Sequence, residues 1–289
     1  MFGGTITAII TPFRKDGSID EEALRRLVAF QEESGVDAVV PCGSTGESAT
    51  LSFDEHVRVI ETVVGCVKNI KVIAGAGSNS TSEAIALSRR AEQAGAHGIL
   101  SISPYYNKPT QEGIFRHYEA ISSSIGIPLI VYNVPGRTAS NITSDTALRL
   151  ADVPGIAGIK EASGDMEQVQ RIINGRPKGF SVLSGDDSLA YGIMRAGGDG
   201  VISVASNCVP VKMSAMIRAC SSGKDDEAQW MHKELMPLFE ALFCETNPIP
   251  IKYIMGKLGY GSGSLRLPLT ELTEKNCTLI DNIMRSVIR

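Results

Sequence analysis

The sequence predicts an α/β protein, a (β/α)8 or TIM barrel with a small C-terminal helical appendage. Short apolar runs rich in β-branched residues alternate with longer amphipathic stretches, which is typical of successive βαβ units and a parallel sheet. Eight such units follow one another at intervals of roughly 20–35 residues, and eight is the number that closes a barrel of this kind.

The apolar runs are the expected strands. In chain order they cover residues 4–10, 38–41, 72–76, 98–101, 129–132, 157–160, 180–183 and 200–204. An open, doubly wound sheet is the rival interpretation, but such a sheet normally has a glycine-rich phosphate turn after its first strand. Residues 10–13 (ITPF) form no such turn, so the closed barrel is favoured.

Helices are expected between the strands, including residues 21–34, 53–67, 82–94 and 111–124. Side chains that can cap a helix N-terminus precede them, and most first turns carry an acidic residue. These predicted caps are Asp20, Ser52, Thr81 and Thr110. Glycines stand where helices should end, namely Gly35, Gly95, Gly126 and Gly197. From Pro210 onward no strand interrupts the helical patterns, so we expect the barrel over residues 1–225 and the appendage over 226–289.

The composition excludes several classes of protein. The 289 residues carry a net charge of −4 without a basic cluster, so no nucleic-acid partner is expected. No apolar run is long enough to span a membrane and residues 1–5 do not resemble a secretory signal, which predicts a cytoplasmic protein. The six scattered cysteines indicate reduced thiols, and the four histidines lack metal-ligand spacing. Asp186 and Asp187 are expected to cap a helix or loop rather than to bind magnesium.

Polar side chains gather where the expected strands end, which is where a barrel of this kind carries its reactive groups. After the second strand, residues 43–48 (GSTGES) offer converging backbone N–H groups and the hydroxyls of Ser44 and Thr45. These could hold a small carboxylate or simply cap the next helix.

After the fifth strand, Tyr132 could move protons. Arg137 could bind a carboxylate through two N–H bonds or form a surface salt bridge.

Lys160 closes the sixth strand, after residues 155–159 (GIAGI). A buried lysine must pair with a charge or lose its proton, because desolvation disfavours the ammonium. Schiff-base formation with a carbonyl requires the neutral amine. A lysine that extends from the strand end to solvent is the ordinary alternative. The polar groups at the other strand ends favour a Schiff-base lysine that binds a small 2-keto acid.

Six ordered motifs resemble the dihydrodipicolinate synthase (4-hydroxy-tetrahydrodipicolinate synthase) family, and the match runs over residues 3–270. The motifs are residues 43–51 (GSTGESATL), 104–109 (PYYNKP), 132–138 (YNVPGRT), 158–162 (GIKEA), 183–187 (LSGDD) and 245–250 (ETNPIP). The resemblance implies condensation of pyruvate with L-aspartate 4-semialdehyde, the first committed step of diaminopimelate and lysine biosynthesis. It also implies that no metal or organic cofactor takes part.

The resemblance assigns roles residue by residue. Lys160 would form the pyruvate imine, and Tyr132 would pass protons to and from it. Ser44 would link Tyr132 to a tyrosine donated by the neighbouring subunit, which Tyr106 matches. The remaining positions implied to bind substrate are Thr45 for the pyruvate carboxylate, Arg137 for the semialdehyde carboxylate, and Gly185 and Ile202 for the pocket lining. A dimer would be the smallest working unit, and the usual form is a tetramer of two dimers.

Lysine inhibits many family members at the dimer interface. The matching positions here are Ser48, Ala49, Phe53, His56, Asn79, Glu83 and Tyr105. Glu83 would pair with the effector's ammonium, whereas Phe53 replaces a histidine found in some sensitive members. Two further departures concern the catalytic site. Ser44 stands where threonine is more common and lacks the methyl that restricts χ1, and Ala139 stands where glycine is usual.

Three alternatives stay open at this point. The first is an N-acetylneuraminate lyase or another pyruvate-dependent sugar-acid aldolase of the same superfamily, although Arg137 favours a second carboxylate over a polyol. The second is a ligand-binding regulator on an inactivated barrel, which the retained Lys160 and Tyr132 disfavour. The third is a phosphate-binding isomerase, which the acidic pair Asp186 and Asp187 disfavours.

Overall fold

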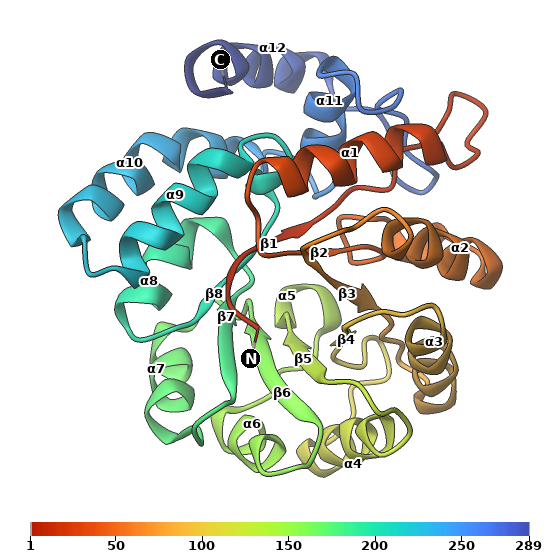
Figure 1. The fold of residues 1–289 in the computed structure, drawn as a ribbon, viewed down its shortest axis with the longest axis vertical. Coiled ribbons are helices and arrows are strands. Elements are labelled where there is room, and N and C mark those ends of the chain that lie inside the picture. The colour runs from red at the N-terminus through yellow and green to blue at the C-terminus, as the bar shows by residue number, and fades with distance from the viewer. Residues whose placement is uncertain (1, 289) are drawn as a thin grey trace.

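Eight parallel strands form a closed barrel in the computed structural model, which describes residues 2–288 (Figure 1). The strands are β1 (Gly4–Ala8), β2 (Ala38–Val40), β3 (Lys71–Gly75), β4 (Gly98–Ile102), β5 (Leu129–Asn133), β6 (Ile156–Glu161), β7 (Ser181–Ser184) and β8 (Gly200–Ser203). Ile6 of β1 pairs with Ala38 of β2 on one side and with Ile202 of β8 on the other. The predicted barrel is therefore confirmed, and the open sheet is excluded because β1 has no free edge.

Helices surround the barrel in the order the sequence predicts. They are α1 (Glu21–Glu33), α2 (Phe53–Val64), α3 (Thr81–Gln93), α4 (Gln111–Ser122), α6 (Ser144–Ala151), α7 (Met166–Gly175), α8 (Ala190–Arg195) and α9 (Pro210–Ser221), with a short α5 (Pro135–Thr138) directly after β5. Then follow α10 (Asp225–Ala241), α11 (Ile249–Lys257) and α12 (Glu274–Ile283). In Figure 1 these last helices lie along one side of the barrel. Arg26 of α1 donates to the carbonyl of Gly259, just after the end of α11, at 3.0 Å.

The division between barrel and appendage stays a prediction. The boundary expected between residues 225 and 226 falls in the first turn of α10, which packs against α9. No helix among residues 2–288 is long and apolar enough to cross a membrane.

Most helix boundaries follow the predicted signals, with two corrections. Asp20, Ser52 and Thr110 cap α1, α2 and α4 as predicted. Thr81 is not a cap, because Ser80 holds the N-cap position and the Thr81 hydroxyl bonds the His117 ring instead, at 2.9 Å.

The second correction concerns the glycines that follow helices. Gly35, Gly95 and Gly197 adopt the left-handed conformation of helix-ending glycines, with φ of 76°, 91° and 102°. Gly126 does not belong with them, since it lies beyond the α4 C-cap Ser123 and its N–H donates to Glu92.

Strand alternation separates two hydrophobic clusters. Side chains that point outward pack against the helices, while a smaller cluster fills the barrel and includes Ile6, Ile73, Ile130, Leu183 and Ile202. Successive residues of a strand point to opposite faces. On β6, Ile159 belongs to the outer cluster and the Glu161 side chain bonds Gln168 of α7. Lys160 between them therefore points into the barrel.

Candidate active site

Lys160 occupies the inner face of β6 close to its C-terminal end. Its partners in the parallel ladder are Tyr132 of β5 and Leu183 of β7. Only 6% of the lysine is exposed, so it is not the strand-end lysine reaching solvent that the sequence left open. Its Nζ lies 4.2 Å from the centre of the Tyr132 ring.

Burial lowers the pKa of Lys160 from 10.5 to about 8. The carboxylates of Asp187 and Asp186 oppose this shift by stabilising the ammonium, whereas the Arg137 charge adds to it. With a pKa of about 8, about one amine in ten is neutral at pH 7, compared with far fewer for an ordinary lysine. The site thus provides a nucleophilic amine near neutral pH.

Gly185, directly after β7, leaves room for the Lys160 side chain. A Cβ at this position would lie 3.0 Å from Cε of Lys160 and 2.7 Å from Cβ of Ala162. Ala162 follows β6 and its N–H bonds the backbone of Asn133, so it is fixed in place. Any side chain at position 185 would therefore displace the lysine.

Tyr132 lies beside Lys160 and carries a hydroxyl that can exchange a proton. Burial raises its pKa to about 12, although the Arg137 charge and a hydrogen bond with Ser44 both lower it. The phenol is therefore protonated at neutral pH. The relay through Ser44 stays a prediction.

The turn after β2 brings Ser44 and Thr45 to the same cavity. Backbone bonds from Gly46 to Gly43 at 3.0 Å and from Glu47 to Ser44 at 3.2 Å fold residues 43–48 into a compact turn. The Thr45 hydroxyl accepts a bond from Nδ2 of Asn247 at 3.0 Å.

A cavity of about 150 Å³ joins these groups at the C-terminal end of the barrel. The predicted site residues that line it are Ser44, Thr45, Tyr132, Arg137, Lys160 and Gly185. Nη2 of Arg137 donates to the backbone carbonyl of Asn247 at 3.1 Å. This bond uses one of the five N–H donors of the guanidinium. Arg137 therefore lines the cavity and is not the surface salt-bridge residue that the sequence left open.

Two predicted site residues lie elsewhere. Tyr106 is 86% exposed on the loop after β4 and adopts a left-handed φ of 71°. It does not line the cavity of its own chain. Ile202 is fully buried in the cluster that fills the barrel and does not line the cavity either, so its role stays a prediction.

Most of the predicted effector residues line a neighbouring cavity of about 470 Å³. They are Ser48, Ala49, Phe53, His56, Glu83 and Tyr105. Asn79 lies beside this cavity, since its Nδ2 donates to the carbonyl of Tyr105 at 3.1 Å. Ser44, Arg137 and Asn247 contact both cavities, so the two sites share a wall.

Sequence reasoning assigned no catalytic or substrate-binding role to two residues at or beside the site. Asn247 lies in the ETNPIP motif that carried part of the resemblance, but it belongs to the appendage and follows no strand. It is buried, and its Oδ1 has no hydrogen-bond partner within residues 2–288. Asp187 is the second residue. Its Oδ2 accepts N–H bonds from Val204 at 3.0 Å and Ala205 at 2.8 Å, and burial raises its pKa to about 6.

The first residue of the acidic pair after β7 caps a short helical turn. Asp186 accepts a bond from the Ser188 N–H and caps the short helical turn Asp187–Leu189, as the sequence predicts. Across the part of the chain that the structure describes, no three His, Cys, Asp or Glu side chains are grouped to hold a metal ion.

The chain is similar along almost its whole length to one enzyme family. The Dihydrodipicolinate synthetase family matches residues 1–286. The chain belongs to this family. A 4-hydroxy-tetrahydrodipicolinate synthase from Syntrophus aciditrophicus (strain SB) is 50% identical over 287 residues, which make up 99% of this chain and 98% of the relative.

Solved structures agree. Dihydrodipicolinate synthase from Acinetobacter baumannii, complexed with pyruvate, is 42% identical with a TM-score of 0.98 over 100% of both chains. The enzyme from Cyanidioschyzon merolae, with lysine bound, is 41% identical with a TM-score of 0.97 and covers 99% of this chain and 98% of that one. The predicted family, enzyme class and function, a 4-hydroxy-tetrahydrodipicolinate synthase of lysine biosynthesis, are confirmed. The family works through a lysine Schiff base and without a cofactor.

We expect Gly185→Ala to lower kcat/KM in the synthase assay by about a hundredfold, because the added Cβ displaces the amine from the cavity. Gly192→Ala in α8 is the matched control, since its Cβ would approach only Cε of Met166, at 3.8 Å. Wild-type activity in Gly185→Ala would show that Lys160 does not need this space.

Proposed function

We propose that Lys160 is the Schiff-base lysine and that the chain condenses pyruvate with L-aspartate 4-semialdehyde. The observation that carries this proposal is a buried amine of lowered pKa in a cavity that also holds Tyr132, a hydroxyl turn and Arg137. A cytoplasmic location agrees with the absence of a membrane-spanning helix among residues 2–288.

In the first step, the neutral amine of Lys160 attacks the C2 carbonyl of pyruvate. The carbonyl oxygen leaves as water with one proton from the amine and one from the Tyr132 hydroxyl, which is left as a phenolate. The pyruvate carboxylate binds the backbone N–H and hydroxyl of Thr45, in the turn that precedes Glu47. The adduct is an iminium on Nζ of Lys160.

In the second step, the Tyr132 phenolate takes a proton from the former methyl group of pyruvate, which turns the iminium into an enamine. The resulting enamine attacks the aldehyde of the semialdehyde, whose carboxylate binds the guanidinium of Arg137. Tyr132 later gives this proton to the alkoxide formed on the aldehyde. The substrate amine then closes onto the imine carbon, and this transimination releases Lys160. The lysine itself accepts the electrons, so the steps need no metal or organic cofactor.

Tyr106 completes the proton relay from a second copy of the chain. Its exposure and left-handed backbone hold the ring away from its own cavity, which supports donation to a neighbour through Ser44. We therefore propose a dimer as the smallest active unit, and two dimers as the complete assembly. Ser44 lacks the methyl of threonine, so the relay relies on the packed turn rather than on a restricted χ1.

The second cavity is the proposed lysine site. Glu83 would pair with the ammonium of the effector, and it already accepts a bond from the Ser78 hydroxyl. Burial lowers the pKa of His56, whose Nε2 is within 2.6 Å of the Gly75 carbonyl. The ring is thus neutral at physiological pH and adds no positive charge that would repel lysine.

Borohydride reduction in the presence of pyruvate should add one reduced pyruvyl mass to the peptide that contains Lys160. Peptide mass spectrometry makes this measurement, with Lys257→Met, which removes a lysine of α11 that pairs with Asp281, as a control that keeps Lys160. An adduct at another lysine, or none, would remove the basis of the proposed mechanism.

Replacing Arg137 by alanine should raise the KM for the semialdehyde by about a hundredfold, while imine formation with pyruvate stays within a few-fold. Arg137→Lys should show an intermediate loss, because it keeps the charge but not the two parallel donors. Equal loss of imine formation and turnover would contradict the role given to Arg137.

We expect lysine to inhibit the enzyme at roughly millimolar concentration, and Glu83→Ala should abolish this inhibition. Millimolar binding has a small free energy, so the loss of one charge-assisted pair removes most of it. Glu92→Ala on the same helix α3 should retain the inhibition, since Glu92 contacts Gly126 away from the cavity. Initial rates against lysine concentration provide the comparison, and inhibition of Glu83→Ala at wild-type potency would locate the effector elsewhere.

A further inference from the structure

A second group of buried charges joins the appendage to loop 43–50. Lys252 of α11 pairs with Glu47 of the loop, and each side chain is only 1% exposed. Nζ of Lys252 also lies 3.9 Å from the centre of the Phe13 ring. Burial lowers the pKa of Lys252, while the carboxylate of Glu47 raises it. No step of the proposed reaction uses either residue.

Stability alone does not explain this pair. A buried ion pair loses so much hydration that apolar residues of similar volume often serve the fold as well or better. Glu47 moreover adopts a left-handed conformation, with φ of 52° and ψ of 38°, which a residue with a side chain rarely takes. The surrounding contacts must therefore hold it there.

The conformation of Glu47 is tied to the catalytic turn. Its N–H donates to the carbonyl of Ser44 at 3.2 Å, and the carbonyl of the preceding Gly46 accepts from the Thr11 hydroxyl at 2.7 Å. A change in backbone angles at Glu47 would move Ser44 and Thr45 together, since only Gly46 separates Thr45 from Glu47.

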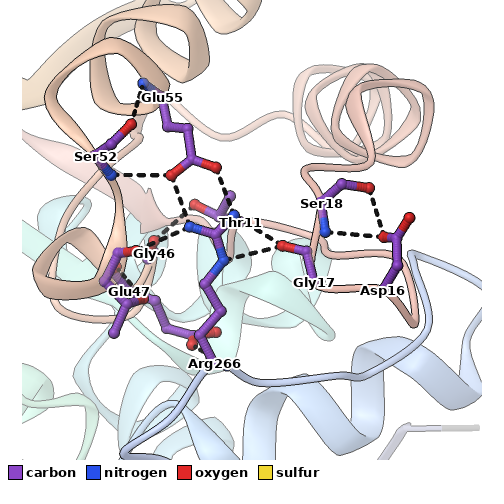
Figure 2. A network of polar contacts seen from close by, with 10 residues as sticks. Thr11, Asp16, Gly17, Ser18, Gly46, Glu47, Ser52, Glu55 and Arg266 are labelled. Carbon is purple, nitrogen blue, oxygen red and sulfur yellow. Dashed lines mark hydrogen bonds and ion pairs between the residues drawn. The ribbon is translucent and has the colours of Figure 1, made fainter.

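Arg266, between α11 and α12, holds the other end of the loop. Figure 2 shows its guanidinium reaching Glu55 and the carbonyl of Gly17. It donates to both oxygens of Glu55 at 2.7 and 2.6 Å and to the carbonyl of Thr50 at 2.8 Å, and its backbone N–H donates to Glu47 at 3.1 Å. The bond from Arg266 lowers the pKa of Glu55 to about 2, so this pair is ionised throughout the physiological range.

We propose that Glu47, Lys252 and Arg266 are positioning residues, through which the appendage fixes Ser44 and Thr45 at the pyruvate position. This inference rests on the proposed function. The appendage reaches the turn at three points along its sequence. Asn247 bonds the Thr45 hydroxyl, Lys252 pairs with Glu47, and Arg266 bonds Glu47 and Thr50.

The test removes the two buried charges together, in Glu47→Gln/Lys252→Met, so that no unpaired charge stays in the interior. The control is Lys257→Met/Asp281→Asn, which removes an ion pair between α11 and α12 that does not touch the loop. Both proteins are compared with the wild type by melting temperature, by KM for each substrate and by the single-turnover rate of imine formation with pyruvate.

We expect the double variant to fold and to show a pyruvate KM about tenfold higher or more, with slower imine formation, because the carboxylate site is no longer aligned. The KM for the semialdehyde should change less, since the Asn247 carbonyl that holds Arg137 is outside the loop. Each single variant should lose as much as the pair, because the two residues act as a unit.

If the double variant melts far below the wild type, Arg266→Gln replaces it, because this variant leaves the buried pair intact. Its pyruvate KM and rate of imine formation are then compared with those of the wild type. A folded variant with wild-type pyruvate KM and imine rate overturns the inference, and so does an equal loss in the control. The proposed function fails in a different way, namely when the wild type itself forms no pyruvate adduct at Lys160.

Discussion

The burial of one amine is the constraint on which the rest of the structure depends. Lys160 lies on the inner face of β6, where desolvation lowers its pKa to about 8. The carboxylates of Asp186 and Asp187 limit the shift, and the charge of Arg137 adds to it. A fully solvated lysine would remain an ammonium, and one surrounded only by apolar groups would bind no carboxylate substrate. The cavity combines both needs, because it lowers the pKa of the amine and keeps charged groups beside it.

The barrel supplies this geometry through register and alternation. Because Tyr132 and Lys160 are ladder partners, the pairing of β5 with β6 places the proposed proton donor next to the proposed nucleophile. The next residues, Asn133 and Glu161, point outward and bond each other, which holds the same two strands together behind the site. The appendage then adds what the strands lack, as Asn247 contacts both Thr45 and Arg137.

The sequence predicted the parts of this account that depend on local pattern. Apolar runs located each strand to within two residues, and the polar strand ends contained Lys160, Tyr132, Ser44, Thr45 and Arg137. The errors at Thr81 and Gly126 arose because capping depends on neighbours such as His117 and Glu92, which lie on other elements. Asn247 and Lys252 gave no strand-end signal, since long-range packing alone brings the appendage to the turn after β2.

The most direct test of the central claim is the pH dependence of imine formation with pyruvate in single turnovers, with mass spectrometry after borohydride as the readout. The account requires the neutral amine, whose folded-state pKa is about 8 instead of 10.5. The rate constant should therefore rise about tenfold per pH unit below pH 8 and level off above it. A rate that keeps rising in this way to pH 10 would show that burial does not tune Lys160, and would contradict the account.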